Sequence, residues 1–289
     1  MPDRSLSSRM WTALNHTLLA LFALMALIPF LYIVAGSFTT AAELARRGFI
    51  LFPTEFSLEA YEYVFSAPTI PRSLVISVLV TVFGTLINLF LTSLMAYPLS
   101  RQDLVGRRQI MFMVVFAMLF NGGMIPTFLV VKSLGLIDSY WSLVLPIAII
   151  AFNLIILKSF FQQLPEGLEE AAKIDGCNDL MILFRIVLPL STPALATLAL
   201  FYGVLHWNSF FNAILYINDS TKWPVQVWLR QIVLLSTGGF TDTSVEGSIP
   251  PSQTMKMAVI VISTIPIVMV YPFLQKYFAK GALIGSVKG

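Results

Sequence analysis

Charged residues are scarce in this sequence: Asp, Glu, Lys and Arg make up 11% of its 289 residues, whereas soluble domains carry about a quarter. Hydrophobic residues make up 57%, and the mean hydropathy is +0.82. This shortage of charge excludes an ordinary soluble domain and indicates a protein that crosses a membrane several times. The formal net charge is only +3, which argues against nucleic acid as a partner.

Cysteine and histidine are nearly absent as well. Cys177 is the only cysteine, so no internal disulfide can form and no second cysteine is available for a metal site. His16 and His206 lie far apart in the sequence, and no Ser-His-acid arrangement is suggested. The sequence also lacks a Gly-x-x-x-x-Gly-Lys-Ser/Thr loop, which would cradle the phosphates of ATP. We therefore expect no catalytic residue, no metal site and no cofactor on this chain.

Long hydrophobic runs fill most of the chain instead. A helix needs about 20 apolar residues to cross the hydrocarbon core of a bilayer, and six runs qualify. They are about Leu18–Gly36, Leu74–Pro98, Ile110–Val131, Trp141–Phe161, Ile182–Trp207 and Met257–Phe278. Several prolines interrupt or flank them, which bundled membrane helices tolerate: Pro29, Pro126, Pro146, Pro189, Pro193 and Pro266. The first run is long and starts late for a cleavable signal peptide, so we expect a retained helix. The sequence predicts an all-α, six-span membrane protein with a single domain over residues 1–289.

Lysine and arginine in the short loops predict the orientation. The connection 100–109 holds three arginines, whereas 132–140 holds a single lysine. Both ends of the chain are basic as well: Arg4, Arg9, Lys276, Lys280 and Lys288. All the basic-rich pieces fall on the cytoplasmic side if both termini are cytoplasmic. The long loops 37–73 and 209–256 then lie outside, and the tail 279–289 lies in the cytoplasm.

The same orientation places the loop 165–181 in the cytoplasm, and this loop carries the polar segment Glu170–Gly176. Pro165 can open a helix there, and the helix dipole favours glutamates near its start. Ala171 and Ala172 are strong helix formers that would present a smooth face, and Gly176 permits a turn that a side chain would resist. We expect a short helix, a glycine turn and a second helix. Helix-cap chemistry alone explains much of this pattern, so an ordinary interhelical loop remains an alternative.

A family resemblance bears on that alternative. Glu-Ala-Ala-x-x-Asp-Gly at Glu170–Gly176, followed after nine residues by Ile186-Val187-Leu188-Pro189, resembles the coupling motif of permease subunits in binding-protein-dependent ABC importers. The stretch Lys280–Gly289 is similar to the tail of maltose-type permeases in the carbohydrate-uptake branch. Asn121–Pro126 and Trp207–Phe211 look like the subgroup that imports oligosaccharides from acidic or plant polysaccharides, with alginate importers as the nearest example. The resemblance covers nearly the whole chain.

The resemblance implies the type I importer permease fold, which moves its cargo by alternating access, and it assigns roles to the coupling helix. Glu170 would supply charge or hydrogen bonds to the docked partner, and Ala171 and Ala172 would permit close contact. Asp175 would cap or pair locally, and Gly176 would make the turn. The tail would reach the ATPase dimer interface through four residues: Gly281, Gly285, Lys288 and Gly289.

It also implies the partners. Two ATP-binding subunits would hold ATP and Mg, and a second, non-identical homologous permease would complete the pore as a heterodimer. An extracytoplasmic solute-binding protein would face the loop 216–252 and deliver an oligosaccharide. The complex would lie in the lipid of the cytoplasmic (inner) membrane. No nucleic acid is expected.

Polar residues in the spans are candidates for the substrate path, because an unpaired polar group is costly there. They are Asn88, Asn121, Asn153, His206, Asn208 and Asn212, together with the aromatic Trp207. The alternative for each asparagine is a hydrogen bond to a neighbouring helix, and His206 is expected near the outer water interface. The spans hold almost no Arg or Lys for an acidic substrate, so either the partner permease supplies that charge or the cavity binds substrate weakly.

Two other classes of protein remain open. An ion-coupled secondary sugar transporter would usually carry acidic or basic residues inside its spans, and these are nearly missing here. If the chain were a structural or regulatory membrane protein, the polar segment Glu170–Gly176 would have no specific role.

Overall fold

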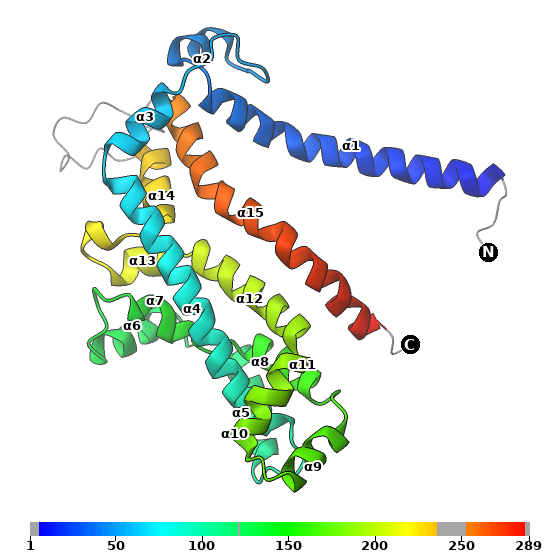
Figure 1. Ribbon diagram of the computed structural model, residues 1–289. Coiled ribbons are helices and arrows are strands. Elements are labelled where there is room, and N and C mark those ends of the chain that lie inside the picture. The colour runs from blue at the N-terminus through cyan, green and yellow to red at the C-terminus, as the bar shows by residue number, and fades with distance from the viewer. Residues whose placement is uncertain (1–5, 121, 236–252, 287–289) are drawn as a thin grey trace. The chain divides into compact units, whose positions relative to one another are not determined.

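A computed structural model describes residues 6–120, 122–235 and 253–286, and these residues form helices and loops without a β-strand (Figure 1). The helices are α1 (Leu6–Ser37), α2 (Ala41–Arg47), α3 (Glu59–Ser66), α4 (Thr69–Ser100), α5 (Arg107–Leu119), α6 (Met124–Ser133), α7 (Trp141–Val144), η1 (Leu145–Ile147), α8 (Ala151–Phe161), α9 (Glu166–Ile174), α10 (Asp179–Ile182), η2 (Leu183–Val187), α11 (Leu188–Leu190), α12 (Thr192–Trp207), α13 (Phe211–Tyr216), η3 (Ser220–Lys222), α14 (Val225–Leu235) and α15 (Gln253–Ser286). The predicted all-α class is confirmed for these residues.

The helices long and apolar enough to cross a membrane agree with the six predicted runs. Three single helices qualify: α1 over Met10–Ser37, α4, and the first part of α15, Gln253–Val270. Three bent pairs bring the number to as many as six: α5 with α6, α7 and η1 with α8, and α10 to α11 with α12. Each predicted run falls on one of these helices or pairs.

Two of the bends have a clear chemical origin. The fourth run bends by 56° between Ile147 and Ala151, just after Pro146. The fifth run bends by 84° at Ser191, because Pro193 has no N–H to donate to the carbonyl of Pro189. The hydroxyl of Thr192 donates to that carbonyl instead, at 2.6 Å. Side chains therefore replace the backbone hydrogen bonds that the bends remove.

The chain divides into two compact units. Unit 1 comprises residues 1–70 and 229–265, and its core joins Leu44, Ile50 and Met257, with Tyr32 packed against them. In α1 only 6% of the most apolar 18-residue window is buried, so most of that helix is open to lipid or another chain. At Gly36 a Cβ atom would lie 2.3 Å from the Met257 sulfur, so glycine lets the two helices approach closely.

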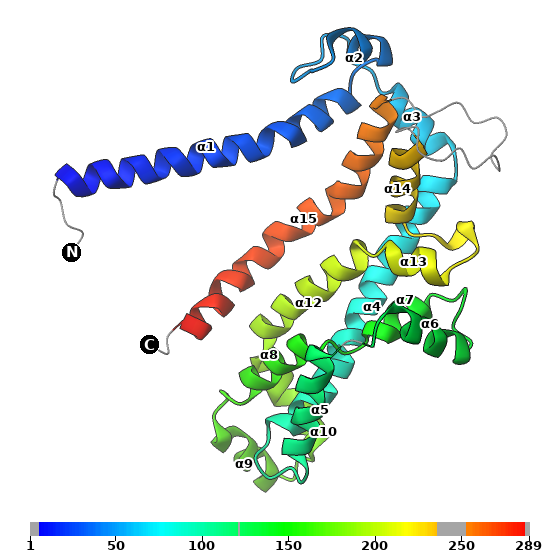
Figure 2. The same ribbon diagram turned by 180° about the vertical axis from the view of Figure 1, so that it is seen from behind.

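Unit 2 comprises residues 71–228 and 266–289. Its main core joins the last turns of α4 to α5, α8, α9, η2 and α12, with Leu157, Leu198 and Tyr202 fully buried. Helix α9 lies at one end of this unit in both views (Figures 1 and 2). The fold therefore carries the polar segment at the tip of a packed helical body.

Candidate functional site

Helix α9 contains the polar segment and ends in a turn built around Gly176. The Gly176 N–H donates to the Lys173 carbonyl at 3.0 Å, and the Cys177 N–H donates to the Ala172 carbonyl at 2.9 Å, which together form a Schellman motif. Gly176 has φ +81°, a conformation that residues with a Cβ rarely adopt. No atom lies within 4 Å of a Cβ placed there, so the backbone conformation, and not lack of space, requires glycine.

The faces of α9 differ in exposure. Glu170 and Ala171 are exposed, and so is Asp175, which ends the helix. Ala172 is only 5% exposed and belongs to the main core of unit 2. This differs from the expectation that both alanines form the outer contact face: Ala172 packs inward, because one helical face must bury its apolar side chains. The surface open to a partner is therefore Glu170, Ala171 and the Asp175–Gly176 turn.

Glu169, which the sequence analysis did not single out, fixes α9 to α4. Its carboxylate forms an ion pair with Arg101, and the Tyr97 hydroxyl donates to it at 3.5 Å. The Arg101 guanidinium also lies over the Tyr97 ring, 4.5 Å from its centre, within the range of a cation–π contact. The side chain of Glu169 is 10% exposed and that of Arg101 24%. In the sequence, Glu169 was only one of several glutamates near the start of a predicted helix.

Local contacts join α9 to the fifth span. The side chain of Asn178 caps α10 by accepting the Met181 N–H at 2.8 Å. Lys173 and Asp179 form an exposed ion pair at 3.5 Å, which contributes little by itself. Helix α10 continues through η2, where Leu183 and Val187 join the main core. Helix α9 is therefore followed directly by elements that pack into the main core of unit 2.

The basic connection 100–109 lies at the same end of unit 2 as α9. Arg101 reaches Glu169, and the Gln162 side chain donates to the Ser100 carbonyl at 3.3 Å. The Nε of Arg107 donates to the Leu99 carbonyl at 3.1 Å. These contacts satisfy carbonyls at the end of α4, which no helical N–H reaches. The polar segment and the basic connection thus lie at the same end of unit 2.

Of the tail residues, Gly281 and Gly285 lie in the last turns of α15, whereas Lys288 and Gly289 lie outside the described residues.

Among the substrate-path candidates, His206 is part of a buried hydrogen-bonded cluster. It is 3% exposed, and its Nε2 lies 3.1 Å from the side-chain oxygen of Asn88. The Asn88 amide donates to the Ile147 carbonyl, which the bend in the fourth run leaves without a helical partner. Gly84 allows this packing, because a Cβ there would lie 2.7 Å from the His206 ring. His206 therefore supports a bent helix from within, and its expected place near the outer water interface stays a prediction.

A second pair of side chains holds the other edge of the same bend. The Ile150 N–H donates to the Tyr202 hydroxyl at 3.2 Å, and that hydroxyl lies 2.8 Å from the Thr92 hydroxyl. Tyr202 and Thr92 are both fully buried. Helices α4 and α12 thus clamp the bend at Ile147 and Ile150, and this use of polar groups is structural.

The remaining candidates that the structure describes lie on different elements. Asn153 is buried in α8, Asn208 is exposed and donates to the Val204 carbonyl at 2.9 Å, and Asn212 is half-buried in α13. Trp207 is 5% exposed and lines an apolar pocket of about 190 Å³ between α4, α12 and α15. Asn121 lies outside the described residues. The substrate path through these residues stays a prediction.

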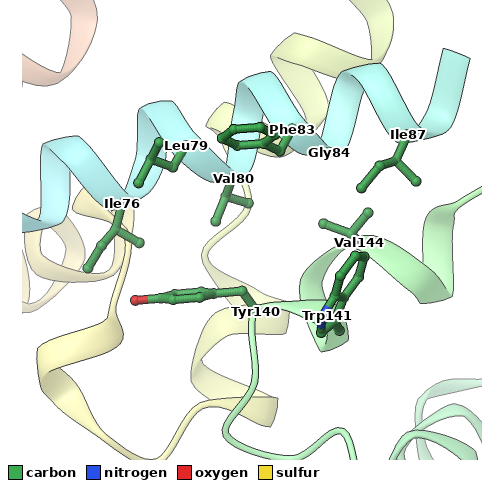
Figure 3. Close-up of a pocket in the computed structure, with 9 residues that line it drawn as sticks. All are labelled: Ile76, Leu79, Val80, Phe83, Gly84, Ile87, Tyr140, Trp141 and Val144. Carbon is green, nitrogen blue, oxygen red and sulfur yellow. The ribbon is translucent and has the colours of Figure 1, made fainter. Parts of the chain in front are cut away.

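A second pocket, of about 210 Å³, lies between α4 and the start of the fourth run (Figure 3). Its lining is Ile76, Leu79, Val80, Phe83, Gly84, Ile87, Tyr140, Trp141 and Val144. Burial raises the pKa of Tyr140, while the nearby charges of Arg72 and Lys222 oppose that shift. The Tyr140 hydroxyl is the only hydroxyl group in this lining, so the pocket has little to offer a sugar.

Within the described ranges, no three His, Cys, Asp or Glu side chains come together as a possible metal site.

Comparisons with known proteins match nearly the whole chain. The pattern that defines the binding-protein-dependent transport system inner membrane component matches residues 6–283. The polygalacturonan/rhamnogalacturonan transport system permease protein YtcP of Bacillus subtilis strain 168 is 62% identical over 286 residues, covering 98% of this chain and 100% of the relative. Protein LplC of the same organism is 57% identical, covering 98% of this chain and 96% of the relative.

A solved structure shares the fold. It is the crystal structure of a bacterial ABC transporter involved in the import of the acidic polysaccharide alginate. One of its chains superimposes with a TM-score of 0.87 at 35% identity, covering 96% of this chain and 100% of that one. The chain therefore belongs to the family of inner membrane components of binding-protein-dependent transport systems.

Proposed function

We propose that this chain is one permease subunit of an ATP-driven importer for oligosaccharides derived from acidic polysaccharides. The observation that carries the coupling role is α9: Glu170 and Ala171 are exposed on a short helix that the Glu169–Arg101 ion pair fixes to α4. A solvent-facing helix that is held to the spans suits a docking element. When a docked subunit moves, such a helix moves the spans with it, whereas a flexible loop would absorb the movement.

The nature of the cargo rests on the relatives. YtcP is named for polygalacturonan and rhamnogalacturonan, and the structural relative is described as importing alginate. These polymers share uronic acids, so an acidic oligosaccharide is the chemistry common to both. The 62% identity to YtcP favours galacturonate-containing fragments over alginate, whose importer is 35% identical.

The partners and orientation belong to the same proposal. Two ATP-binding subunits hold ATP and Mg, a homologous second permease completes a heterodimer, and an extracytoplasmic binding protein delivers the cargo to the loop 216–252. Residues 1–289 act as one permease domain with both termini in the cytoplasm. The positive connection 100–109 supports this orientation, because it lies at the same end as α9. The tail 279–289 reaches the ATPase interface.

Transport in proteoliposomes tests the proposal. The complete complex, loaded with ATP inside, is given binding protein and trigalacturonate, with maltotriose as a neutral control of the same length. We expect ATP-dependent uptake of trigalacturonate and faster ATP hydrolysis when the loaded binding protein is present.

Glu170→Lys serves as the matched variant, because it reverses the exposed charge of α9 without touching its core face. It should abolish stimulation of ATP hydrolysis while the spans remain inserted. Uptake that follows a proton or sodium gradient and ignores ATP would instead identify an ion-coupled secondary transporter.

A further inference from the structure

The pocket in Figure 3 is a groove that is apolar along its length and polar at one end. Seven of the nine residues that line it carry no polar side-chain group: five are aliphatic, and the other two are Phe83 and Gly84. The remaining two are Tyr140 and Trp141. In Figure 3 the Tyr140 hydroxyl points along the groove toward its Ile76 end. A ligand that fills the groove must therefore be apolar over most of its length.

A cation stands at the polar end. Ile76, Val80, Phe83 and Ile87 repeat every three or four residues, so they share one face of α4. Arg72 continues this face one turn beyond Ile76, and its charge acts on Tyr140. Arg72 is exposed and has no ion pair within the described part of the chain.

The other charges near Tyr140 are already engaged. Lys222 forms an ion pair with Asp138 at 3.0 Å and also donates to its carbonyl. The Asp219 carboxylate accepts the N–H and hydroxyl of Thr221. Arg72 is therefore the cation left to bind an anionic group at this end of the groove.

The length of the groove identifies the rest of the ligand. From Ile76 to Ile87 the helix rises about 16 Å at 1.5 Å per residue, which is about half of the ~30 Å hydrocarbon core, or one leaflet. We propose that this groove binds a phospholipid with an anionic headgroup, its acyl chain along α4 and its phosphate against Arg72 and the Tyr140 hydroxyl. Tyr140 and Trp141 then lie at the headgroup level, where such rings are favoured.

A sugar fits this groove poorly. A sugar needs several donors and acceptors, and the lining supplies a single hydroxyl group. The acidic cargo of the proposed function shares only its negative charge with a phospholipid, so the test includes it as a competing ligand.

Lipid titration of the assembled complex tests the proposal. The complex is stripped of lipid in maltoside detergent, and phosphatidylglycerol or phosphatidylcholine with the same chains is added back while Tm is followed. We expect phosphatidylglycerol to bind more tightly. Arg72→Gln should weaken it about tenfold, the loss of one charge-assisted hydrogen bond, and leave phosphatidylcholine unchanged.

Two further variants distinguish binding of the lipid headgroup from binding of its acyl chain. Leu79→Trp fills the groove from an exposed position and should weaken both lipids. Arg46→Gln removes an arginine from helix α2, one that pairs with Glu55, and should change the binding of neither lipid. Three results would overturn the proposal: an unchanged preference for phosphatidylglycerol in Arg72→Gln, unchanged lipid binding in Leu79→Trp, or displacement of the lipid by trigalacturonate. None of them depends on whether ATP drives uptake.

Discussion

Two buried glutamates, one in each unit, organise polar segments in different ways. In unit 1, Glu43 is 1% exposed and accepts hydrogen bonds from Thr39 and Thr54 and from the Glu55 N–H, in addition to its ion pair with Arg47. All of these partners lie 4 to 12 residues away in the sequence. In unit 2, the partners of Glu169 are Arg101 and Tyr97, and Tyr97 lies 72 residues away.

The two glutamates should therefore have different roles: one stabilises its own loop, and the other couples two helices. A carboxylate with local partners holds its own loop together, and its loss should be felt within that loop. A carboxylate with distant partners joins two helices that the chain does not connect directly. Glu169 therefore links α9 to α4, whereas Glu43 closes the loop between Thr39 and Glu55.

The largest effect is expected from Glu169→Ala. It leaves Arg101 without its carboxylate, and removing one partner of a fully buried ion pair costs roughly 3–5 kcal/mol. The cost here should be smaller, because Arg101 is 24% exposed. We expect α9 to loosen from α4 and ATP-driven uptake to fall at least about tenfold, measured in proteoliposomes beside basal ATP hydrolysis.

Exchanging the two charges provides the control. Glu169→Arg combined with Arg101→Glu restores an ion pair and should recover part of the lost uptake. If Glu169→Ala transported as well as the unchanged protein, α9 would not act through α4.

Glu43→Ala should give the opposite pattern. It removes the acceptor of the Thr39 and Thr54 hydroxyls, and unpaired buried donors are destabilising. We expect a drop of several degrees in Tm and faster proteolysis between Thr39 and Glu55, with ATP-driven uptake per folded complex nearly unchanged. A loss of uptake as large as that of Glu169→Ala, without loss of Tm, would break the distinction between the two glutamates.

Local chemistry was predictable from the sequence. The glycine turn at Gly176 was correct, because a helix end and a left-handed turn are properties of a few adjacent residues. Each of the six runs likewise falls on a helix or bent pair that is apolar enough to cross a membrane, since length and hydropathy decide which segments can do so. The prolines also marked where runs four and five bend.

Pairings between distant residues were not predictable. Arg101 was interpreted only as an orientation charge, and nothing in the sequence connects it with Glu169. His206 was interpreted as a substrate-path residue because it is polar in a span, yet it pairs with Asn88, 118 residues away. Ala172 was assigned to the outer face, since a sequence does not state which side of a short helix meets the core.

The smallest effect, a pH dependence, would sharpen the comparison further. The hydroxyl and N–H donors around Glu43 hold the pKa of its carboxyl well below the ordinary value of 4.5. A lowered pKa in the folded state adds stability that is complete above the unfolded value and is lost as pH falls through the folded one. The amides of Thr54 and Glu55 report on this directly, because both donate to the carboxylate, at 3.1 and 2.9 Å.

Their hydrogen exchange, corrected for intrinsic rates, should be constant from pH 8 to 5 and should accelerate below about 4.5 as the unfolded loop takes up a proton. Glu43→Gln should be flat over the whole range, since its amide does not titrate. Loss of protection already between pH 8 and 6 would mean that another group holds this loop. The hydrogen bonds around Glu43 would then not hold this loop by themselves, and the contrast with the Glu169–Arg101 ion pair would fail.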